Sequence, residues 1–358
     1  MEFFPIKMKN YNVIGLMSGT SVDGLDLVYV RFKYENSWSY RIIYSKTYSY
    51  NDKWKTILKK LSKTSYGMIK EIDRNYTKLL SKIILEFISE FSISNIDFVS
   101  SHGHTALHDP SNSLTYQIGN LPEISSLISL KVICDFRSQD IKLGGQGAPL
   151  VPVGEKYLFS EFNTFINLGG FANVTKKLNN KLIAYDICPI NIIFNYLSSL
   201  KGYEYDDRGK IASTGKMNIK LYDSLQSINY YKLKSPKSLS AEWINTTINP
   251  LLNKFSEIPV QDLLNTFSNH FAFQIVSNIQ TKDKILITGG GVYNSYLIDR
   301  INNLTNAKIT IPDRNIIEYK EALIFAFLGL LRYLDIDNCY SSVTGSEKDH
   351  CSGNIFNP

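Results

Sequence analysis

The chain contains few cysteines, and they stand far apart. Only 4 of its 358 residues are cysteine, and Cys134, Cys188, Cys339 and Cys351 never approach the Cys-x-x-Cys spacing of zinc or redox sites. Scattered free thiols are typical of proteins that stay in a reducing compartment. The pattern therefore argues against a disulfide-stabilised secreted protein and predicts a cytoplasmic one.

Long apolar runs are also missing. The most apolar stretch, 322–331, is bounded by Glu321 and Arg332 and is far too short to cross a bilayer. Residues 1–10 place lysines after two phenylalanines and a proline, and they lack the apolar core of a signal peptide. We therefore expect no membrane association, and we expect a buried helix over 322–331.

Dense positive charge is absent as well. Lysine and arginine number 39 against 33 acidic residues, a net charge of +6, but lysines occur only singly or in pairs such as Lys59 and Lys60. Nucleic-acid binding needs a denser basic patch, so we expect no nucleic-acid partner. A phosphate-bearing small molecule is a sufficient partner for so thin a surplus of charge.

The residues that are present predict a globular α/β protein. The length suggests about two domains, and 44% hydrophobic with 20% charged residues is a usual globular composition. Strand-like and helix-like stretches alternate along the chain. The expected strands are 11–16, 27–32, 97–100, 131–136, 164–168 and 284–288, with a hairpin over 174–186 turning at Asn179 and Asn180. The expected helices are 54–61, 68–91 and 321–333.

One segment, GLMSGTSVDGLD at 15–26, places glycines, hydroxyls and carboxylates between two expected strands. Glycine lets backbone N–H groups approach a polyphosphate, hydroxyls assist, and a carboxylate can orient a metal ion. The segment is not a Walker loop, because a strand rather than a helix follows it. An ordinary β-turn explains the same residue types, so this segment alone leaves both interpretations open.

Two further expected strands end in glycines. They are INLGGFANVT at 166–175 and ILITGGGVYNS at 285–295. The three glycine turns, in this order, match the phosphate-1, phosphate-2 and adenosine elements of actin-like ATPases. We therefore predict two ribonuclease H-like domains that flank a nucleotide cleft. The predicted ATP-binding residues are Gly19, Thr20, Ser21, Val22, Asp23, Gly24, Leu25, Asp26, Gly169, Gly170, Asn173, Gly289, Gly290, Gly291 and Asn294.

Motifs outside the nucleotide elements carry a family resemblance. Besides GLMSGTSVDGLD and INLGGFANVT, they are DFRSQDIKLGGQGAPLVP at 135–152, EALIFAFL at 321–328, SHGHTALH, TYQIGN, YDDRGKIASTG and VTG. With these motifs the chain resembles the anhydro-N-acetylmuramic acid kinases from about residue 13 to 345. The segment GGQGAPLVP is the most specific, since it is not a generic nucleotide-binding pattern.

The resemblance implies an unusual reaction in cell-wall sugar recycling. Such a kinase uses ATP and Mg²⁺ to phosphorylate O6 of 1,6-anhydro-N-acetylmuramic acid, while water attacks C1 and opens the internal ether. It also implies a first domain of 1–138 with 340–358, a second domain of 139–339, and a homodimer, the state common among members of the family. Because an ether oxygen carries no proton, a general base would act on the attacking water.

Asp186 is the predicted base. Within YDICPIN it aligns with the aspartate of the family motif DTGPGN, although the same residue could simply cap the next helix. Three small or polar positions of that motif have become Ile187, Cys188 and Ile190. Two lost glycines predict less backbone freedom and a more apolar pocket wall, with the possibility of a different substrate.

The remaining site predictions also follow the motifs. Asp23 is the first choice as Mg²⁺ ligand, with Asp26 as the alternative. Arg137 and Asp140 are candidate sugar contacts, since Arg can bind the lactyl carboxylate bidentately, although an interdomain salt bridge explains them equally well. The other predicted substrate-binding residues are His102, Thr105, Asn191 and Asp206, the last with a surface loop as its alternative; His108 is expected to be structural and His104 not to bind zinc.

Two rival functions remain open on sequence grounds. One is a sugar kinase that phosphorylates an ordinary hydroxyl of a different amino sugar. The other is an actin-like protein that switches with nucleotide but lacks sugar chemistry. A chain that binds nucleotide but has lost turnover is a third possibility.

Overall fold

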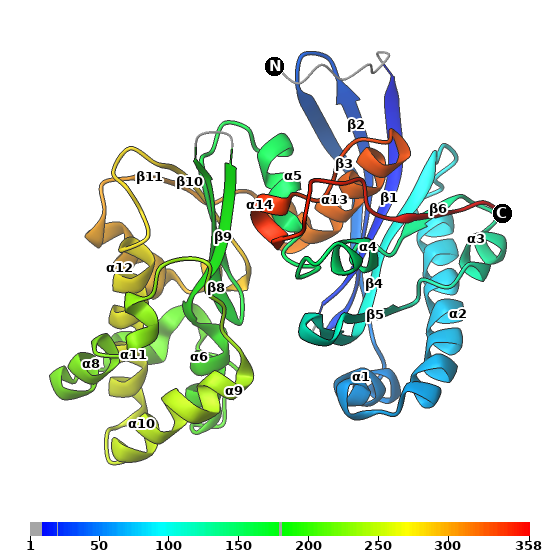
Figure 1. Cartoon of the computed structure of the whole chain (residues 1–358). Coiled ribbons are helices and arrows are strands. Elements are labelled where there is room, and N and C mark those ends of the chain that lie inside the picture. The colour runs from blue at the N-terminus through cyan, green and yellow to red at the C-terminus, as the bar shows by residue number, and fades with distance from the viewer. Residues whose placement is uncertain (1–8, 20, 179–180) are drawn as a thin grey trace. The chain divides into compact units, whose positions relative to one another are not determined.

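The computed structural model describes residues 9–19, 21–178 and 181–358 (Figure 1). Thr20 and the predicted turn at Asn179 and Asn180 lie outside the described residues. The chain forms two compact units: unit 1 comprises Met1–Ser160 with Tyr319–Pro358, and unit 2 is Glu161–Glu318. Among the described helices, none combines the length and apolarity that a bilayer crossing requires.

Unit 1 is built on a mixed sheet with strand order β12-β6-β4-β1-β2-β3, and β5 pairs with β4. β1, β2 and β3 form an antiparallel meander, whereas β4 runs parallel to β1 and β6 runs parallel to β4. The strands are β1 (Asn10–Ser18), β2 (Gly24–Tyr34), β3 (Trp38–Ser49), β4 (Phe98–Asp109), β5 (Leu114–Ile118), β6 (Val132–Cys134) and β12 (Asn354–Phe356).

Unit 2 repeats this arrangement in a sheet ordered β11-β10-β7-β8-β9. β7, β8 and β9 are antiparallel neighbours, whereas β10 and β11 extend the sheet in parallel from β7. The strands are β7 (Thr164–Leu168), β8 (Phe171–Leu178), β9 (Lys181–Pro189), β10 (Lys284–Thr288) and β11 (Lys308–Thr310). An antiparallel three-stranded meander whose first strand is extended on its other side by two successive parallel strands is the ribonuclease H topology, so the predicted α/β fold class is confirmed. The predicted cleft stays a prediction.

Helices cover both sheets. Unit 1 carries α1 (Asp52–Lys60), α2 (Tyr66–Glu90), α3 (Glu123–Ile128), α4 (Ser138–Lys142), α5 (Val151–Leu158) and α14 (Ser341–Thr344), together with most of α13 (Arg314–Tyr333). Unit 2 carries α6 (Asn191–Ser199), α7 (Lys210–Thr214), α8 (Ile219–Gln226), α9 (Ala241–Trp243), α10 (Asn249–Lys254), α11 (Val260–Val276) and α12 (Ser295–Leu304). The predicted helices at 54–61, 68–91 and 321–333 are confirmed by α1, α2 and α13.

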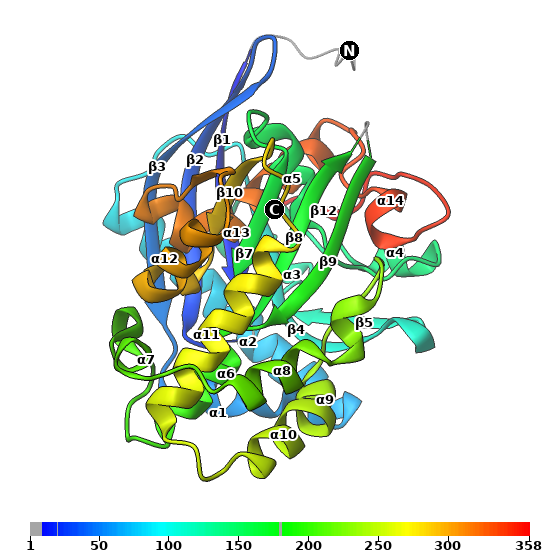
Figure 2. The ribbon, with the colours of Figure 1, turned by 90° about the vertical axis from the view of Figure 1, so that its left-hand side faces the viewer.

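Apolar stripes on the long helices explain how each unit closes. In α2, Ile69, Tyr76, Leu80, Ile84 and Phe87 recur at helical spacing and are buried in the core of unit 1. In unit 2, α11 runs across the sheet (Figure 2) and buries Leu264, Phe267 and Phe271 against it. The apolar stretch 322–331 of α13 is buried throughout, as the sequence predicted.

α13 packs on β1 at a place where no side chain fits. A Cβ at Gly15 would lie 2.3 Å from the carbonyl oxygen of Ala322 and 2.7 Å from Cβ of Ala326. Next to this contact, Lys320 and Glu155 form a buried ion pair at 2.9 Å. These contacts place α5 and α13 in unit 1. The observed boundaries at 160/161 and 318/319 therefore differ from the 138/139 and 339/340 expected from sequence.

We predict that Gly15→Ala destabilises the protein, because its new methyl group meets the α13 backbone. Overpacking of this kind costs about 1–3 kcal/mol, and the midpoint of thermal unfolding should fall. Gly67→Ala in α2 is the matched control, since nothing lies within 4 Å of a Cβ there. Equal midpoints for the two variants would contradict the packing argument.

Candidate functional site

In unit 1, β1 and β2 are joined by the predicted phosphate turn. Val22 donates its backbone N–H to the carbonyl of Gly19 at 3.2 Å and has a φ of 60°. Gly24 lies so close to β3 that a Cβ would be 2.7 Å from the carbonyl oxygen of Tyr48. Leu25 is buried in the core, so it can offer a ligand only its backbone. The result is a tight hairpin turn with Ser21 and Asp23 exposed.

The two carboxylates of the turn differ in availability. Asp26 lies on β2 and accepts a hydrogen bond from Oγ1 of Thr47 at 2.6 Å. Asp23 is exposed, and its carboxylate has no hydrogen bond or ion pair with the residues that the structure describes. This difference favours Asp23 as a metal ligand.

A buried chain of hydroxyl groups supports the end of β1 beneath the turn. Oγ of Ser18 lies 2.8 Å from the hydroxyl of Tyr50 and 2.8 Å from Nδ1 of His104, and Tyr50 continues to Tyr76 at 2.5 Å. Burial lowers the pKa of His104 to about 4 and raises the pKa of Tyr50 to about 12, so both groups are neutral near pH 7. Sequence reasoning missed Tyr50 and Tyr76, which carry no motif.

The three histidines of SHGHTALH have three separate partners. His104 contacts Ser18, and His108 contacts the hydroxyl of Thr115 at 3.1 Å. Nε2 of His102 accepts from Nε of Arg137 at 3.0 Å. Each of these histidines is therefore held by a different neighbour.

Arg137 is held at two points. Besides its bond to His102, it donates from Nη1 to the carbonyl of Gly147 at 2.6 Å. Burial lowers the pKa of Arg137 to about 10, which leaves it charged near pH 7. Burial and this positive charge together keep the pKa of His102 well below its ordinary value, so His102 is a neutral acceptor. In the described part of the chain, the remaining N–H groups of Arg137 have no protein partner, so the side chain is oriented and still able to donate. Thr105, on the same strand as His102, is half-buried.

Asp140 joins the most specific motifs of unit 1. Its Oδ2 accepts from the N–H of Gly147 at 2.6 Å, and its Oδ1 accepts from Oγ1 of Thr344 at 2.7 Å. A Cβ at Gly145 would lie 2.2 Å from the same carboxylate. The segments GGQGAP and VTG therefore meet at one fully buried carboxylate. Asp140 fixes the loop that holds Arg137.

In unit 2, Asp186 lies beside a β-bulge. Asn173 of β8 faces Asp186, whereas its neighbour Ala172 faces Cys188, so Ile187 is the extra residue. A bulge breaks the alternation of side chains between the two faces of a strand. As a result Ile187 and Cys188 are both buried while Asp186 is partly exposed.

Residues of the segment 230–239, which is rich in tyrosine and lysine and carries no recognised motif, contact Asp186. Oδ2 of Asp186 accepts from the N–H of Leu239 at 2.8 Å, and its backbone carbonyl accepts from the hydroxyl of Tyr230 at 2.8 Å. Its own N–H donates to the carbonyl of Lys237 at 3.2 Å. Burial raises the pKa of Asp186, and the Leu239 N–H partly opposes this. Oδ1 has no hydrogen bond with any described residue.

The departures from the family motif do not form a pocket wall. Ile187, Cys188 and Ile190 are at most 1% exposed and belong to the hydrophobic core of unit 2. None of them has a positive φ, so no glycine is needed there. The expectation of a more apolar pocket wall was wrong, because the bulge turns Ile187 and Cys188 inward and Ile190 is buried at the start of α6.

The two glycine turns of unit 2 lie next to each other at the ends of parallel strands. β7 and β10 are neighbours, and a Cβ at Gly289 would lie 2.5 Å from Oδ1 of Asn167. Gly289 has a φ of 87°, whereas Gly170 and Gly290 have open space where a Cβ would be. Asn191 ties the same place together by donating from Nδ2 to the carbonyl of Leu168 at 3.1 Å.

Asp206 is not a surface-loop residue. Among the described residues, no hydrogen bond joins it to Asp186. It is buried, and its two oxygens accept from the N–H groups of Ile211 and Ala212 at 2.7 and 2.9 Å. A Cβ at Gly209 in the same motif would lie 2.4 Å from Oδ1 of Asn294, which caps α12. The motif YDDRGK therefore packs beside the third glycine turn.

Known proteins match this chain along its length. The sequence profile described as anhydro-N-acetylmuramic acid kinase matches residues 11–358. The chain belongs to this family. Proteins named anhydro-N-acetylmuramic acid kinase from Hydrogenovibrio crunogenus and Sulfurimonas denitrificans are 29% and 30% identical to it, each over 96% of this chain and 98% of the relative. The protein of that name from Haemophilus influenzae is 29% identical over 98% of this chain and 99% of its own.

Two solved structures are similar to this member of the anhydro-N-acetylmuramic acid kinase family at low identity. One is the activator of the 2-hydroxyisocaproyl-CoA dehydratase from Clostridium difficile with bound ADPNP, at 16% identity and a TM-score of 0.44, covering 88% of this chain and 92% of that one. The other is component A of the (R)-2-hydroxyglutaryl-CoA dehydratase from Acidaminococcus fermentans, at 11% identity and 0.45, covering 88% and 96%.

We predict that Thr344→Val destabilises the protein by about 1–3 kcal/mol, because it removes one hydrogen bond from the buried Asp140 carboxylate. Thr344→Ser keeps the hydroxyl and is the control. The midpoint of thermal unfolding should fall for valine and change little for serine. A serine variant as unstable as the valine variant would show that the methyl group, not the hydrogen bond, matters.

Proposed function

We propose that this protein uses ATP to phosphorylate O6 of 1,6-anhydro-N-acetylmuramic acid while water opens the 1,6-ether, giving N-acetylmuramic acid 6-phosphate and ADP. The observation that carries the proposal is the family match over residues 11–358. The reaction belongs to the recycling of cell-wall sugars. The four described cysteines are free thiols, and a cytoplasmic location fits them.

The three glycine turns are the proposed ATP contacts. In unit 1 the described part of the turn offers the backbone of Gly19 and of 21–26 and the exposed side chain of Ser21. In unit 2, Gly169 and Gly170 end β7, and Gly289, Gly290 and Gly291 follow β10. The open space at Gly170 and Gly290 lets a ligand approach the backbone closely. Asn173 and Asn294 flank these turns; Asn294 contributes through the α12 N-terminus that it caps.

The proposed magnesium ligand is Asp23. A hard carboxylate oxygen without a protein partner suits Mg²⁺, which keeps several waters and needs only one or two carboxylates. When bound, Mg²⁺ would neutralise charge on the phosphates. Asp26 is less suited because its carboxylate already accepts from Thr47.

Asp186 is the proposed general base for the attacking water. Its Oδ2 is held by Leu239 and its Oδ1 has no described partner, so one oxygen orients the carboxylate and the other can accept a proton. A raised pKa makes the carboxylate a stronger base. In this proposal Asp186 takes its proton from the attacking water, because the ether oxygen has none to give.

On the sugar side, Arg137 is the proposed partner of the lactyl carboxylate, assisted by His102 and Thr105. The two bonds that hold Arg137 leave other N–H groups to donate to an anion. Asp140, Asn191 and Asp206 would act through the backbone segments that their side chains hold. The inward orientation of Ile187, Cys188 and Ile190 removes the argument for a different sugar. A homodimer, which the family resemblance implies, can be checked by light scattering.

The decisive experiment is turnover in ¹⁸O-labelled water with ATP, Mg²⁺ and the anhydro sugar. We expect a sugar 6-phosphate that gains one ¹⁸O at the anomeric carbon by mass spectrometry. Asp186→Asn, nearly isosteric but unable to accept the proton, should lower kcat by about 100-fold or more. Asp299→Asn on the exposed face of α12 is the matched control. Phosphorylation without ¹⁸O would overturn the coupled reaction, and full activity of Asp186→Asn would overturn the base.

The pH dependence of kcat/KM should report Asp186. Because burial raises its pKa above the ordinary 3.8, the base form is present above this raised pKa and is lost as pH falls through it. The ratio of wild-type to Asp186→Asn kcat/KM should therefore decline as the pH is lowered, with its midpoint at a pH above 3.8. Titration of ATP affects both proteins equally and cancels in the ratio. A ratio that stays constant down to pH 4 would contradict this role.

Asp23→Asn should raise the Mg²⁺ concentration needed for half-maximal turnover by about tenfold or more, since one metal ligand loses its charge. Turnover measured against Mg²⁺ at fixed ATP gives this value. Asp52→Asn, at the exposed start of α1, is the control. An unchanged Mg²⁺ requirement would assign the metal elsewhere.

A further inference from the structure

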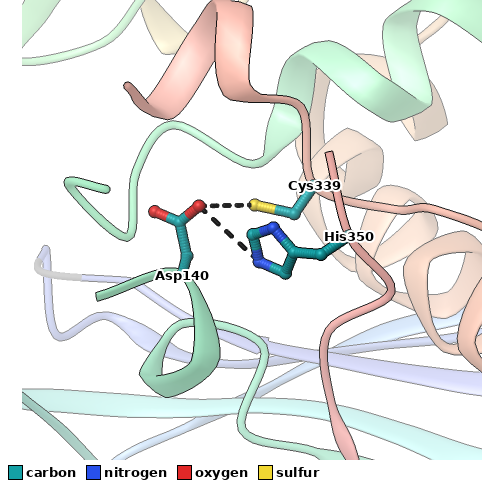
Figure 3. A group of neighbouring side chains, drawn as sticks. All are labelled: Asp140, Cys339 and His350. Carbon is teal, nitrogen blue, oxygen red and sulfur yellow. Dashed lines mark hydrogen bonds and ion pairs between the residues drawn. The ribbon is translucent and has the colours of Figure 1, made fainter. Parts of the chain in front are cut away.

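Three potential metal ligands converge in the interior of unit 1, apart from the proposed magnesium ligand. They are Oδ1 of Asp140, Sγ of Cys339 and Nε2 of His350, and all three lie within 4.8 Å of one another. Figure 3 shows them pointing toward one another, Asp140 from α4 and the other two from the C-terminal segment. Sγ lies 3.1 Å and Nε2 lies 3.7 Å from Oδ1 of Asp140. These separations are close to those between neighbouring ligands of a tetrahedral zinc ion, given metal–ligand bonds of about 2.0–2.3 Å.

The histidine carries the second observation. His350 is 4% exposed, and its Nε2 is buried without a hydrogen-bond partner among the described residues. Its Nδ1 lies 3.1 Å from the carbonyl oxygen of Lys348, so Nδ1 carries a proton, and in the neutral imidazole Nε2 presents a lone pair. A buried nitrogen without a partner costs free energy, and a bound cation would remove that cost. An N–H···O=C bond behind the ligating nitrogen is the usual support of a metal-bound histidine.

The other two ligands are supported in a similar way. Cys339 and His350 are neighbours in an antiparallel bridge, with N–H···O bonds of 3.1 and 3.0 Å in the two directions. This bridge fixes the spacing of Sγ and Nε2. The Asp140 carboxylate is held by Gly147 and Thr344 on its other lone pairs. All three side chains are thus placed by neighbours that a metal ion would not displace.

We propose that Asp140, Cys339 and His350 bind a zinc ion that joins the C-terminal segment 339–350 to α4, with water as the fourth ligand. Thiolate, imidazole and carboxylate together suit Zn²⁺ better than Mg²⁺ or Ca²⁺, which prefer oxygen ligands. On binding, Zn²⁺ enters, the Cys339 thiol releases one proton to solvent, and neutral His350 and ionised Asp140 keep their charge. The site gains one net positive charge in this exchange. No step of the proposed kinase reaction uses this ion.

Without a metal ion, Sγ–H of Cys339 donates to Oδ1 of Asp140 at 3.1 Å. Zinc would replace this proton and bond both atoms. The ion would then hold the loop that includes Gly147, to which Arg137 is bonded.

The test is a cobalt titration of the full-length protein after removal of metal with a chelator. Cobalt bound by a thiolate gives a charge-transfer band in the near ultraviolet, and tetrahedral geometry gives intense visible bands. We expect about one Co²⁺ per chain, displaced by Zn²⁺ and absent with Mg²⁺. His350→Gln, which keeps a polar side chain of similar reach, should weaken binding about 100-fold, and Cys339→Ser should remove the charge-transfer band.

The matched control is Cys351→Ser, which changes the cysteine that follows His350 in the chain and should leave the cobalt spectrum unchanged. If the ligand variants fail to fold, the wild-type protein still decides: zinc should raise its unfolding midpoint and protect Cys339, located by mass spectrometry, from alkylation. Three results would overturn the site. They are no thiolate–cobalt band in the wild type, an unaltered band in His350→Gln, and alkylation of Cys339 that zinc does not slow. The ¹⁸O assay reports the kinase reaction separately.

Discussion

The carboxylate of Asp140 is the interaction on which the sugar-side half of unit 1 depends. A fully buried negative charge must be satisfied by hydrogen-bond donors, or it destabilises the fold by several kcal/mol. Gly147 and Thr344 provide those donors from segments nearly two hundred residues apart in the chain. The carbonyl oxygen of Gly147 accepts a hydrogen bond from Arg137. The buried carboxylate that fixes Gly147 therefore also determines the position of the Arg137 guanidinium group. Gly145 must lack a side chain for the same reason.

Unit 2 solves a comparable problem with backbone groups. As the proposed base, Asp186 needs a carboxylate that is partly desolvated and yet oriented, and the N–H of Leu239 holds it while Tyr230 and Lys237 bond its backbone. Neutral supports of this kind orient the group without lowering its pKa as strongly as a cation would. The hydroxyl chain from Ser18 to Tyr76 under the phosphate turn follows the same rule, since it is polar, buried and uncharged.

Local sequence patterns predicted the elements and the fold class because those depend on period and on turn residues. The stripe of α2, the apolar strands β7 and β10, and the glycines after them are all visible in the sequence. The domain boundaries were not, since they depend on long-range contacts such as Gly15 with Ala322 and Glu155 with Lys320. The residues that enclose Asp186 were also missed, because Leu239 acts through its backbone and has no side-chain signature. The contact between Asp140 and Thr344 could not be predicted from the sequence, because the two motifs lie far apart in the chain and only the fold brings them together.

The bulge at Ile187 lies between the proposed base, Asp186, and the positions that depart from the family motif. By admitting one extra residue, it lets two successive side chains enter the core while Asp186 keeps its outward position. The departures from the motif at Ile187, Cys188 and Ile190 therefore change the filling of the core of unit 2 and leave the side chain of the proposed base in place. A search for related enzymes that demands the glycines of this motif would discard chains that keep the aspartate and its surroundings. The aspartate and the bulge are the better criteria for recognising distant members.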